Sequence, residues 1–266
     1  MLKKLLCVLI ISAISILLCS CSANTDDKDD TSGSSSQTTS SISSDTAPEN
    51  SDSSTSESSE TSQPEKAPTL LFMGHASIRI VTPEDKVIYI DPFQGDGYDL
   101  TADLILVTHG HGDHSAMDKI EKRSDDCVTI THKEALVDGE HKTFELGYVT
   151  VEAVEAGNNK NHDINECVGY VLTFSNGKSV YISGDTSTTE QMSKLAEKEI
   201  DYAFFCCDGN FNMDVEEALR CAEMVGAKHN IPYHYDSGKL SDSDIAEQFN
   251  ADNRLIITPG EELLVE

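Results

Sequence analysis

Short apolar runs separated by polar turns recur from residue 69 to residue 257. Continuous or alternating apolar runs are typical of strands, whereas apolar residues three and four positions apart indicate helices. The runs predict strands at 69–73, 77–81, 87–91, 104–107, 128–130, 142–146, 149–154, 168–174, 179–183, 202–205, 229–231 and 255–257, and helices at 117–123, 133–137, 188–197, 215–225 and 241–249. A strand-rich first half followed by alternating strands and helices fits sheets packed face to face with helices outside.

The first 21 residues depart from this pattern and are predicted to be an export signal. Lys3 and Lys4 precede an apolar stretch at 5–18, which is shorter than the ~20 apolar residues of a membrane-spanning helix. The stretch ends in Leu-Cys-Ser-Cys, which resembles the lipobox of bacterial lipoproteins. That resemblance implies cleavage before Cys21, a lipid on this residue, and an extracytoplasmic protein anchored to the bacterial membrane. An uncleaved signal anchor is the alternative.

Residues 22–67 consist largely of Ser, Thr, Asp and Glu and contain almost no apolar residues. Such a segment cannot bury enough surface to offset its chain entropy, so it is predicted to be a disordered tether. The remaining residues, 68–266, suit one domain with a sizeable core.

The chain carries 47 acidic against 19 basic residues, a net charge of −28, and the excess extends through the predicted domain. Nucleic-acid binding depends on neutralising phosphates with Lys and Arg, so this composition disfavours a nucleic-acid partner.

The predicted domain contains five cysteines without CxxC or zinc-finger spacing: Cys127, Cys167, Cys206, Cys207 and Cys221. An odd number does not suggest a full disulfide framework, and buried apolar roles are expected. One disulfide stays open, and the sequence does not select its partners.

One segment concentrates the candidate chemistry: Thr108-His109-Gly110-His111-Gly112-Asp113-His114, directly after an apolar run. Its two glycines let the backbone curl so that three imidazoles and one carboxylate converge. Imidazole and carboxylate are ligands of cations such as Zn²⁺. The segment therefore predicts a metal site that is completed by ligands from elsewhere in the fold.

Three further candidate ligands lie near the ends of later predicted strands. His162 precedes one strand, while Asp185 and His234 follow two others. Each is weak evidence alone. Together they supply the ligands expected where strand ends converge on one edge of a sheet sandwich.

At this point the sequence resembles a metallo-β-lactamase-fold hydrolase, whose motif runs His-x-His-x-Asp-His, a distant His, Gly-Asp-Thr and a final His. It is similar in particular to the L-ascorbate-6-phosphate lactonase-like branch. The matching segments are Gly74-His75-Ala76-Ser77, Ile90-Asp91-Pro92, the loop with Asn158, Lys160 and His162, Gly209–Met213 and Ile231–Tyr235. The resemblance spans residues 70 to 240 and implies an α/β fold, an αββα sandwich of two mixed β-sheets with helices on the outer faces.

Carried over to this sequence, the resemblance implies two divalent metal ions. His109, His111 and His162 would hold one, Asp113, His114 and His234 the other, and Asp185 would lie between them. The chain departs from the family pattern at Ala156-Gly157-Asn158-Asn159, which lacks an aromatic residue, and at Cys206-Cys207-Asp208, where relatives carry apolar or glycine residues. These departures affect the pocket and the choice of substrate.

Three residues outside the ligand set have competing interpretations. Asp91 either accepts a hydrogen bond from a ligand imidazole or only terminates a strand, and the first is favoured because ligand imidazoles usually need such a partner. His75 either lines the pocket or ends a strand. Lys160 either binds an anionic substrate group or is an ordinary solvated lysine.

The favoured function is hydrolysis of a small-molecule ester, lactone, amide, thioester or phosphoester. The metal ions are expected to be Zn²⁺, with Mn or Fe as alternatives, and they would activate water for attack. Asp113 is the candidate catalytic residue, because it could orient the water and pass a proton to the leaving group. A catalytically silent, surface-tethered binding module is the alternative. A di-iron oxidoreductase is a less favoured alternative. That branch of the superfamily usually has a carboxylate in place of one motif His, and this sequence has no such replacement. The sequence does not decide the oligomeric state.

Overall fold

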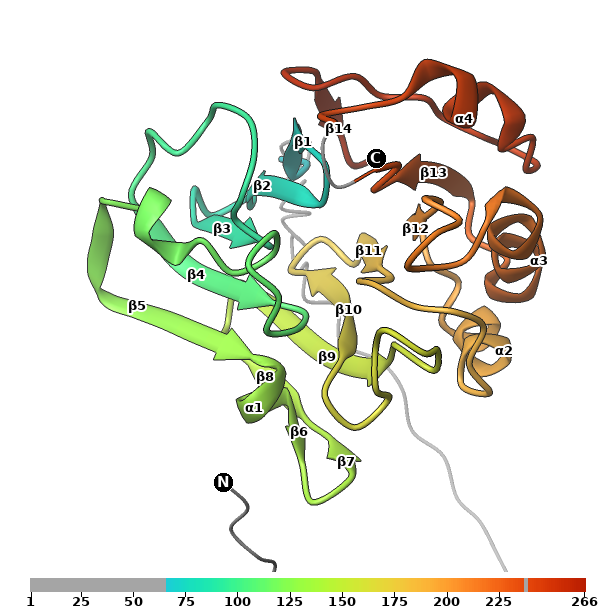
Figure 1. The fold of residues 1–266 in the computed structure, drawn as a ribbon. Helices are drawn as coiled ribbons and strands as arrows, with labels where there is room; N and C mark the ends of the chain where they lie inside the picture. The colour runs from blue at the N-terminus through green and yellow to red at the C-terminus, as the bar shows by residue number, and fades with distance from the viewer. Residues whose placement is uncertain (1–65, 237–238) are drawn as a thin grey trace, which may run out of the picture. The chain divides into compact units, whose positions relative to one another are not determined.

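The computed structural model of the chain describes residues 66–236 and 239–266 (Figure 1). The predicted signal 1–21, its lipid acceptor Cys21 and the predicted tether as far as residue 65 lie outside the described residues. Within the described ranges, no helix combines the length and apolar character that crossing a bilayer requires.

Two six-stranded mixed sheets form the body of the described part. The first has the order β14-β1-β2-β3-β4-β5 and the second β13-β12-β11-β10-β9-β8. The strands of the first sheet are β1 (Thr69–Gly74), β2 (Ser77–Val81), β3 (Val87–Ile90), β4 (Ala102–Val107), β5 (Arg123–Thr131) and β14 (Glu262–Leu264). Those of the second are β8 (Thr143–Glu145), β9 (Val149–Glu155), β10 (Val168–Phe174), β11 (Ser179–Ile182), β12 (Tyr202–Cys206) and β13 (His229–Tyr233).

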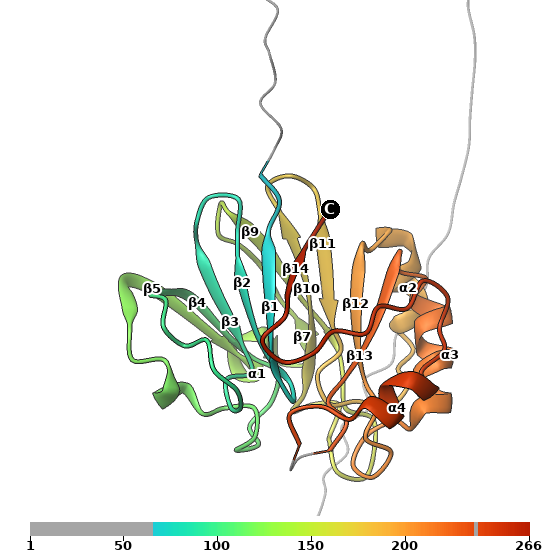
Figure 2. The ribbon, with the colours of Figure 1, turned by 90° about the horizontal axis from the view of Figure 1, so that it is seen from above.

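Figure 2 shows the two sheets as adjacent layers, with α2, α3 and α4 beside β12 and β13. The helical elements are α1 (His132–Ala135), α2 (Met192–Leu195), α3 (Val215–Val225), α4 (Ser243–Gln248) and the 3₁₀ turns η1 (Met117–Lys119) and η2 (Ala196–Lys198). The structure confirms the predicted sandwich of two mixed sheets. The outer face of the first sheet differs from the prediction of helices on both outer faces. Tyr98 and Leu100 from a loop and Met117 from the short turn η1 pack on it.

The alternation of side chains along a strand explains the layers. Leu70 and Phe72 of β1 join the core cluster that contains the residues of the second sheet, whereas Leu71 and Met73 join the cluster on the outer face. Successive residues of a strand point to opposite faces, so β1 is buried on both sides. The inner strands β1, β3 and β4 are therefore nearly continuous apolar runs, whereas β5 at the edge is largely polar and only its Ile130 is buried.

Helix α3 has the predicted bounds because both of its ends are marked in the sequence. The side chain of Asp214 accepts a hydrogen bond from Glu217 N, and Gly226 ends the helix with a φ of 64°. The other helices are shorter than predicted. The helix predicted at 117–123 is only the turn η1, because Arg123 already begins β5 beside β4.

The predicted strand at 255–257 is wrong, and the last strand is β14. Ile257 is buried in the core, so the apolar run packs there without forming a regular sheet ladder. A hairpin of β6 (Leu136–Val137) and β7 (Glu140–His141) was not predicted. Its turn residues Asp138 and Gly139 both have positive φ, which is the conformation favoured by Asp-Gly in two-residue hairpins.

The five cysteines of the described part are all free. Four are buried and Cys127 is partly buried. This agrees with the expectation that they act as small apolar side chains.

Candidate metal centre

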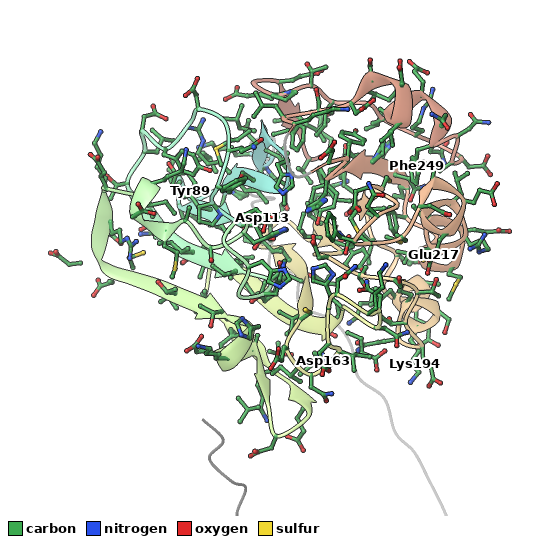
Figure 3. The ribbon with its side chains drawn as sticks, viewed as in Figure 1. Tyr89, Asp113, Asp163, Lys194, Glu217 and Phe249 are labelled. Atoms are coloured by element: carbon green, nitrogen blue, oxygen red, sulfur yellow. The ribbon has the colours of Figure 1, made fainter. Side chains whose placement is uncertain are left out.

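The candidate site lies at one edge of both sheets. In the first sheet β1, β3 and β4 run in the same direction, and in the second sheet β9, β11, β12 and β13 do. The side chains after their carboxyl ends therefore gather at a common edge, where Figure 3 places Asp113 between the two sheets. These residues are His75 after β1, Asp91 after β3, the segment 108–114 after β4, His162 after β9, and Asp185, Asp208 and His234 after β11, β12 and β13.

His109, His111 and His162, which we call the first half-site, offer ligand atoms that lie within 4.8 Å of one another. His162 Nε2 lies 3.2 Å from His111 Nδ1. His109 and His162 are buried, whereas His111 is exposed. Three imidazoles at this spacing could together hold one metal ion.

Asp113, His114 and His234, which we call the second half-site, form another group within the same distance limit, together with His75. The Nε2 atoms of His114 and His234 are 3.2 Å apart. The two histidines are fully or almost fully buried, so their ring nitrogens have little access to water.

Asp185 lies between the half-sites. Its Oδ1 is 3.2 Å from His114 Nε2 and 3.1 Å from His234 Nε2, while its Oδ2 is 3.3 Å from His162 Nε2. The preceding Gly184 has a φ of 62°, and a Cβ there would meet Val168 O at 2.9 Å. Only glycine permits this close approach, which brings the Asp185 carboxylate to both groups of imidazoles.

The donor set fits divalent cations. His109 Nε2 is buried and has no hydrogen-bond partner, and the facing Nε2 atoms of His114 and His234 can share at most one proton. Cations would satisfy such converging lone pairs, because imidazole nitrogens and carboxylate oxygens are typical zinc ligands. The structure thus brings all seven predicted ligand residues together at one edge.

Electrostatics tie the charges of the site to one another. Burial lowers the pKa of His109 to about 2, and the nearby His114 acts in the same direction. Burial alone would raise the pKa of Asp185, but the imidazoles of His114 and His234 lower it well below its usual value. Burial alone would lower the pKa of His114, but Asp185 and Asp91 raise it well above its usual value. A cation bound here would take the place of the positive charge that the imidazoles provide beside Asp185.

Asp91 contacts the second half-site from behind. Its fully buried carboxylate accepts hydrogen bonds from Thr108 N at 2.8 Å and Thr108 Oγ1 at 2.7 Å, and its Oδ2 lies 2.8 Å from His114 Nδ1. This contact fixes which nitrogen of His114 faces the site. It favours the predicted role over that of a strand end alone.

His75 lies inside the site rather than merely at the end of β1. It is fully buried, its Nε2 lies 3.5 Å from Asp113 Oδ2, and its ring centroid is 4.0 Å from that of His234. His75, Asp91 and His234 all have positive φ, a strained conformation for such residues that often marks functional sites.

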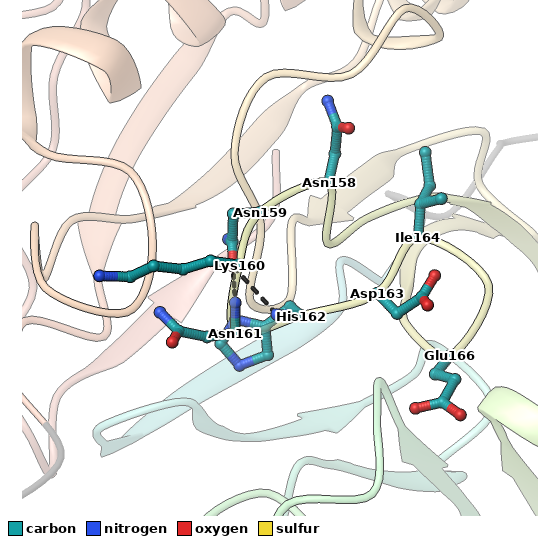
Figure 4. A pocket seen from close by; sticks show the side chains of 8 residues that line it. All are labelled: Asn158, Asn159, Lys160, Asn161, His162, Asp163, Ile164 and Glu166. Carbon is teal, nitrogen blue, oxygen red and sulfur yellow. Dashed lines mark hydrogen bonds between the residues drawn. The ribbon is translucent and has the colours of Figure 1, made fainter.

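Lys160 is exposed and lines a cavity of about 510 Å³ formed by the loop 158–166. In Figure 4 its side chain points away from the imidazole of His162. The same loop is held by Asn159 Oδ1, which accepts hydrogen bonds from the backbone of Asn161 and His162. The anion-binding role of Lys160 stays a prediction.

Sequence reasoning missed Asp208, Asn161 and Phe211 as site residues. Asn161 and Phe211 line a cavity of about 190 Å³ with His111, Asp113, His162, Asp185 and His234. Asp208 lies 3.4 Å from His234. The signals were that Cys206-Cys207-Asp208 departs from the family pattern and that Asn161 and Phe211 lie in two segments that match it.

The fold and the site together define a metallo-β-lactamase-fold protein with a cluster of histidine and aspartate metal-ligand candidates. The family model described as "Beta-lactamase superfamily domain" matches residues 69–234. Within this superfamily, the chain belongs to the UPF0173 family of metal-dependent hydrolases.

Relatives cover the domain almost completely. A UPF0173 metal-dependent hydrolase from Natranaerobius thermophilus is 32% identical over 203 residues, which span 69% of this chain and 90% of the relative. One from Pyrococcus furiosus is 32% identical over 222 residues, with 72% and 97% covered. The crystal structure of a protein from Parabacteroides distasonis, described as a metal-dependent hydrolase, superposes with a TM-score of 0.60 at 28% identity, covering 73% of this chain and 93% of that one.

Proposed function

We propose that the protein is a hydrolase that uses two divalent metal ions, with the first and second half-sites each holding one and Asp185 contacting both. The observation that carries this proposal is the position of Asp185, whose two oxygens face different groups of imidazoles at 3.1 to 3.3 Å. Zn²⁺ suits this donor set, with Mn or Fe as alternatives. Divalent metal ions in such sites polarise the bond to be cleaved and activate water near neutral pH.

The residues of the chain provide positioning and proton transfer. Asp113 is partly exposed and lines the cavity, so one of its oxygens can orient water while the other faces His75. In this proposal Asp113 also passes a proton to the leaving group. Asp185 and Asp91 hold the imidazole of His114 between them.

The proposed substrate is a small molecule with an ester, lactone, amide or phosphoester bond. A cavity of about 190 Å³ suits a small group, and the acidic composition disfavours large polyanions. The similarity to the ascorbate-6-phosphate lactonase-like branch makes lactones the first compounds to test.

We also propose that the chain is exported and lipid-anchored through Cys21, with 22–67 as the tether. Retention in the membrane fraction, lost in C21A, tests this part.

Metal content tests the proposed function. The purified protein should bind close to two equivalents of Zn²⁺ by elemental analysis, and H111A should lose about one. H141A is the matched control, because His141 lies on the β6–β7 hairpin outside the site. A folded protein that binds no Zn²⁺, Mn²⁺ or Fe²⁺ would refute the mechanism. Two bound equivalents without turnover of lactones, esters, amides or phosphoesters would favour the silent binding module.

A further inference from the structure

Phe211 is an exposed aromatic side chain at the candidate site. Among the large apolar side chains of the described residues it is the most exposed, at 54%, ahead of Val128, Val137, Leu240 and Leu264. None of the other four lines the cavity beside Asp185. An exposed aromatic ring at the wall of a pocket is the usual way to bind an apolar part of a ligand.

One carboxylate builds the loop that carries Phe211. Asp208 Oδ1 accepts hydrogen bonds from the backbone nitrogens of Asn210 at 2.8 Å, Phe211 at 2.7 Å and Asn212 at 3.3 Å. Asp208 Oδ2 accepts a further hydrogen bond from Asn212 Nδ2 at 2.6 Å. This side chain is therefore the main hydrogen-bond acceptor for the loop 209–212, which also has a backbone hydrogen bond from Gly209 N to Met213 O.

The same carboxylate contacts the second half-site. Asp208 Oδ2 lies 3.4 Å from His234 Nδ1, while His234 Nε2 faces Asp185 Oδ1 at 3.1 Å. The His234 ring thus lies between two carboxylates, and Asp208 is itself buried. Outer carboxylates of this kind fix the orientation of a ligand imidazole.

The loop is also joined to the first half-site. Asn161 Nδ2 donates a hydrogen bond to Phe211 O at 3.0 Å, and Asn161 immediately precedes His162. The backbone that carries Phe211 is therefore attached to the elements of both half-sites.

We propose that Asp208 is a positioning residue that holds both the imidazole of His234 and the loop 209–212, so that Phe211 forms an apolar wall of the pocket. This wall selects substrates with a small apolar group beside the cleaved bond. The inference rests on the proposed function, because it needs a metal at the second half-site. Since coupling between two sites is reciprocal, metal at the second half-site and the order of the Phe211 loop stabilise each other.

The chain contains no tryptophan, so the F211W variant places a single fluorescent reporter on the loop. Zn²⁺ is titrated into F211W, F211W/D208N and F211W/D214N, with calorimetry and indole emission recorded together. In D208N the amide oxygen can still accept from the backbone, but the amide nitrogen now faces the donor Asn212 Nδ2. D214N is the matched control, because Asp214 caps α3 from the same segment and Asn caps a helix equally well.

We expect D208N to lower the affinity for one of the two zinc ions by about tenfold or more. It should also abolish the change in indole emission that accompanies the binding of that ion. The other equivalent and the D214N variant should match F211W, and thermal unfolding establishes that D208N is folded at the titration temperature. The proposed coupling between the loop and the second half-site would be overturned by any of three results. These are zinc affinities that D208N leaves unchanged, an indole emission of F211W that does not change when zinc binds, or an equal loss of affinity for both zinc ions. If F211W and the unsubstituted protein both bind no Zn²⁺, Mn²⁺ or Fe²⁺, the proposed function fails instead.

A second experiment tests the apolar wall with straight-chain carboxylates from acetate to hexanoate, which mimic the acid product of ester or amide hydrolysis. Their affinity for the zinc-loaded protein should rise about two- to fourfold per methylene, and F211S should abolish this rise. V137S, which removes an exposed apolar side chain elsewhere, should keep it. Two bound zinc equivalents with no dependence on chain length would overturn the wall while leaving the proposed function standing.

Discussion

The two half-sites differ in how the protein supports them. In the second half-site, His114 contacts Asp91 and His234 contacts Asp208 through the ring nitrogens that face away from Asp185. In the first half-site, His109 Nδ1 contacts only the hydroxyl of Thr108.

The other two imidazoles of the first half-site have still less support. His162 Nδ1 is buried without a hydrogen-bond partner, and His111 is exposed. His234 Nδ1 makes no hydrogen bond either, but it lies 3.4 Å from the carboxylate of Asp208. Because outer carboxylates raise the basicity and fix the orientation of imidazole ligands, the second half-site should bind its metal ion more tightly. Two similar sets of ligand residues can therefore differ in metal affinity because different residues contact their imidazoles from behind.

Removing the residue that both half-sites share should weaken both of them. We expect D185N to weaken zinc binding at both half-sites by at least about 100-fold, above the losses typical of outer partners, and to abolish hydrolysis. D163N is the matched control, because Asp163 is an exposed carboxylate in the neighbouring loop. Stepwise calorimetric titration provides the measurement, and parental affinity at either half-site would contradict the bridging role.

Removing one outer carboxylate should weaken only one half-site. D91N should lower zinc affinity at the second half-site about 10- to 100-fold and leave the first unchanged, because the Asp91 side chain contacts His114 and no imidazole of the first half-site. D103N is the control, since Asp103 also accepts a hydrogen bond from a backbone nitrogen of the first sheet, that of Val87. Equal losses at both half-sites, measured by the same titration, would mean that Asp91 acts only by stabilising the fold.

Chelation should reveal the difference without any substitution. Dialysis against increasing chelator should remove zinc in two phases. The first half-site should lose its ion at about tenfold lower chelator concentration, because an outer hydrogen-bond partner typically changes metal affinity by about 10- to 100-fold and tenfold is the lower end of that range. Elemental analysis follows the metal, and H111A should lack the early phase. A single phase carrying both equivalents would show that the carboxylate backing has no effect on affinity.

A carboxylate at the other end of the second sheet should change stability and not the metal sites. Asp201 accepts hydrogen bonds from Ser179 N at 2.9 Å and Lys228 Nζ at 2.7 Å. Burial alone would raise the pKa of Asp201, but these partners lower it. The stabilisation is therefore present above pH ~4 and disappears as the pH falls through the folded-state pKa.

D201N should lower the free energy of unfolding by about 1 kcal/mol at neutral pH, since Lys228 is largely solvated. Denaturant unfolding at several pH values tests this, and the difference from the parent should narrow below pH ~4. A changed ratio of the two zinc affinities would show that the ends of the sheet are coupled.

The ligand residues could be predicted because all but His162 follow a strand that their own neighbours define, and His162 precedes one. His109 to His114 follow the apolar run of β4, and Asp185 and His234 follow β11 and β13. Strand order could not be read from such local patterns, but the shared edge needed only that these strands run in one direction.

The supporting residues were harder to predict, because their contacts join segments far apart in the chain. His75 contacts Asp113 and His234, and nothing near it in sequence distinguishes a pocket residue from a strand end. Asp208 looked like a departure from the family pattern rather than a partner of His234. The apolar run at 255–257 failed as a strand because local pattern cannot tell a packed segment from a paired one.

Strand β14 pairs with β1, so the first and last strands of the described domain are neighbours. Contacts between residues so distant in sequence close a very long loop and tend to form late in folding. Until then β1 presents an unpaired backbone edge beside the apolar side chains of Leu70 and Leu71. Open edges of this kind recruit strands from other molecules. In the folded domain the short strand β14 covers this edge, so a chain that lost β14 would be prone to self-association.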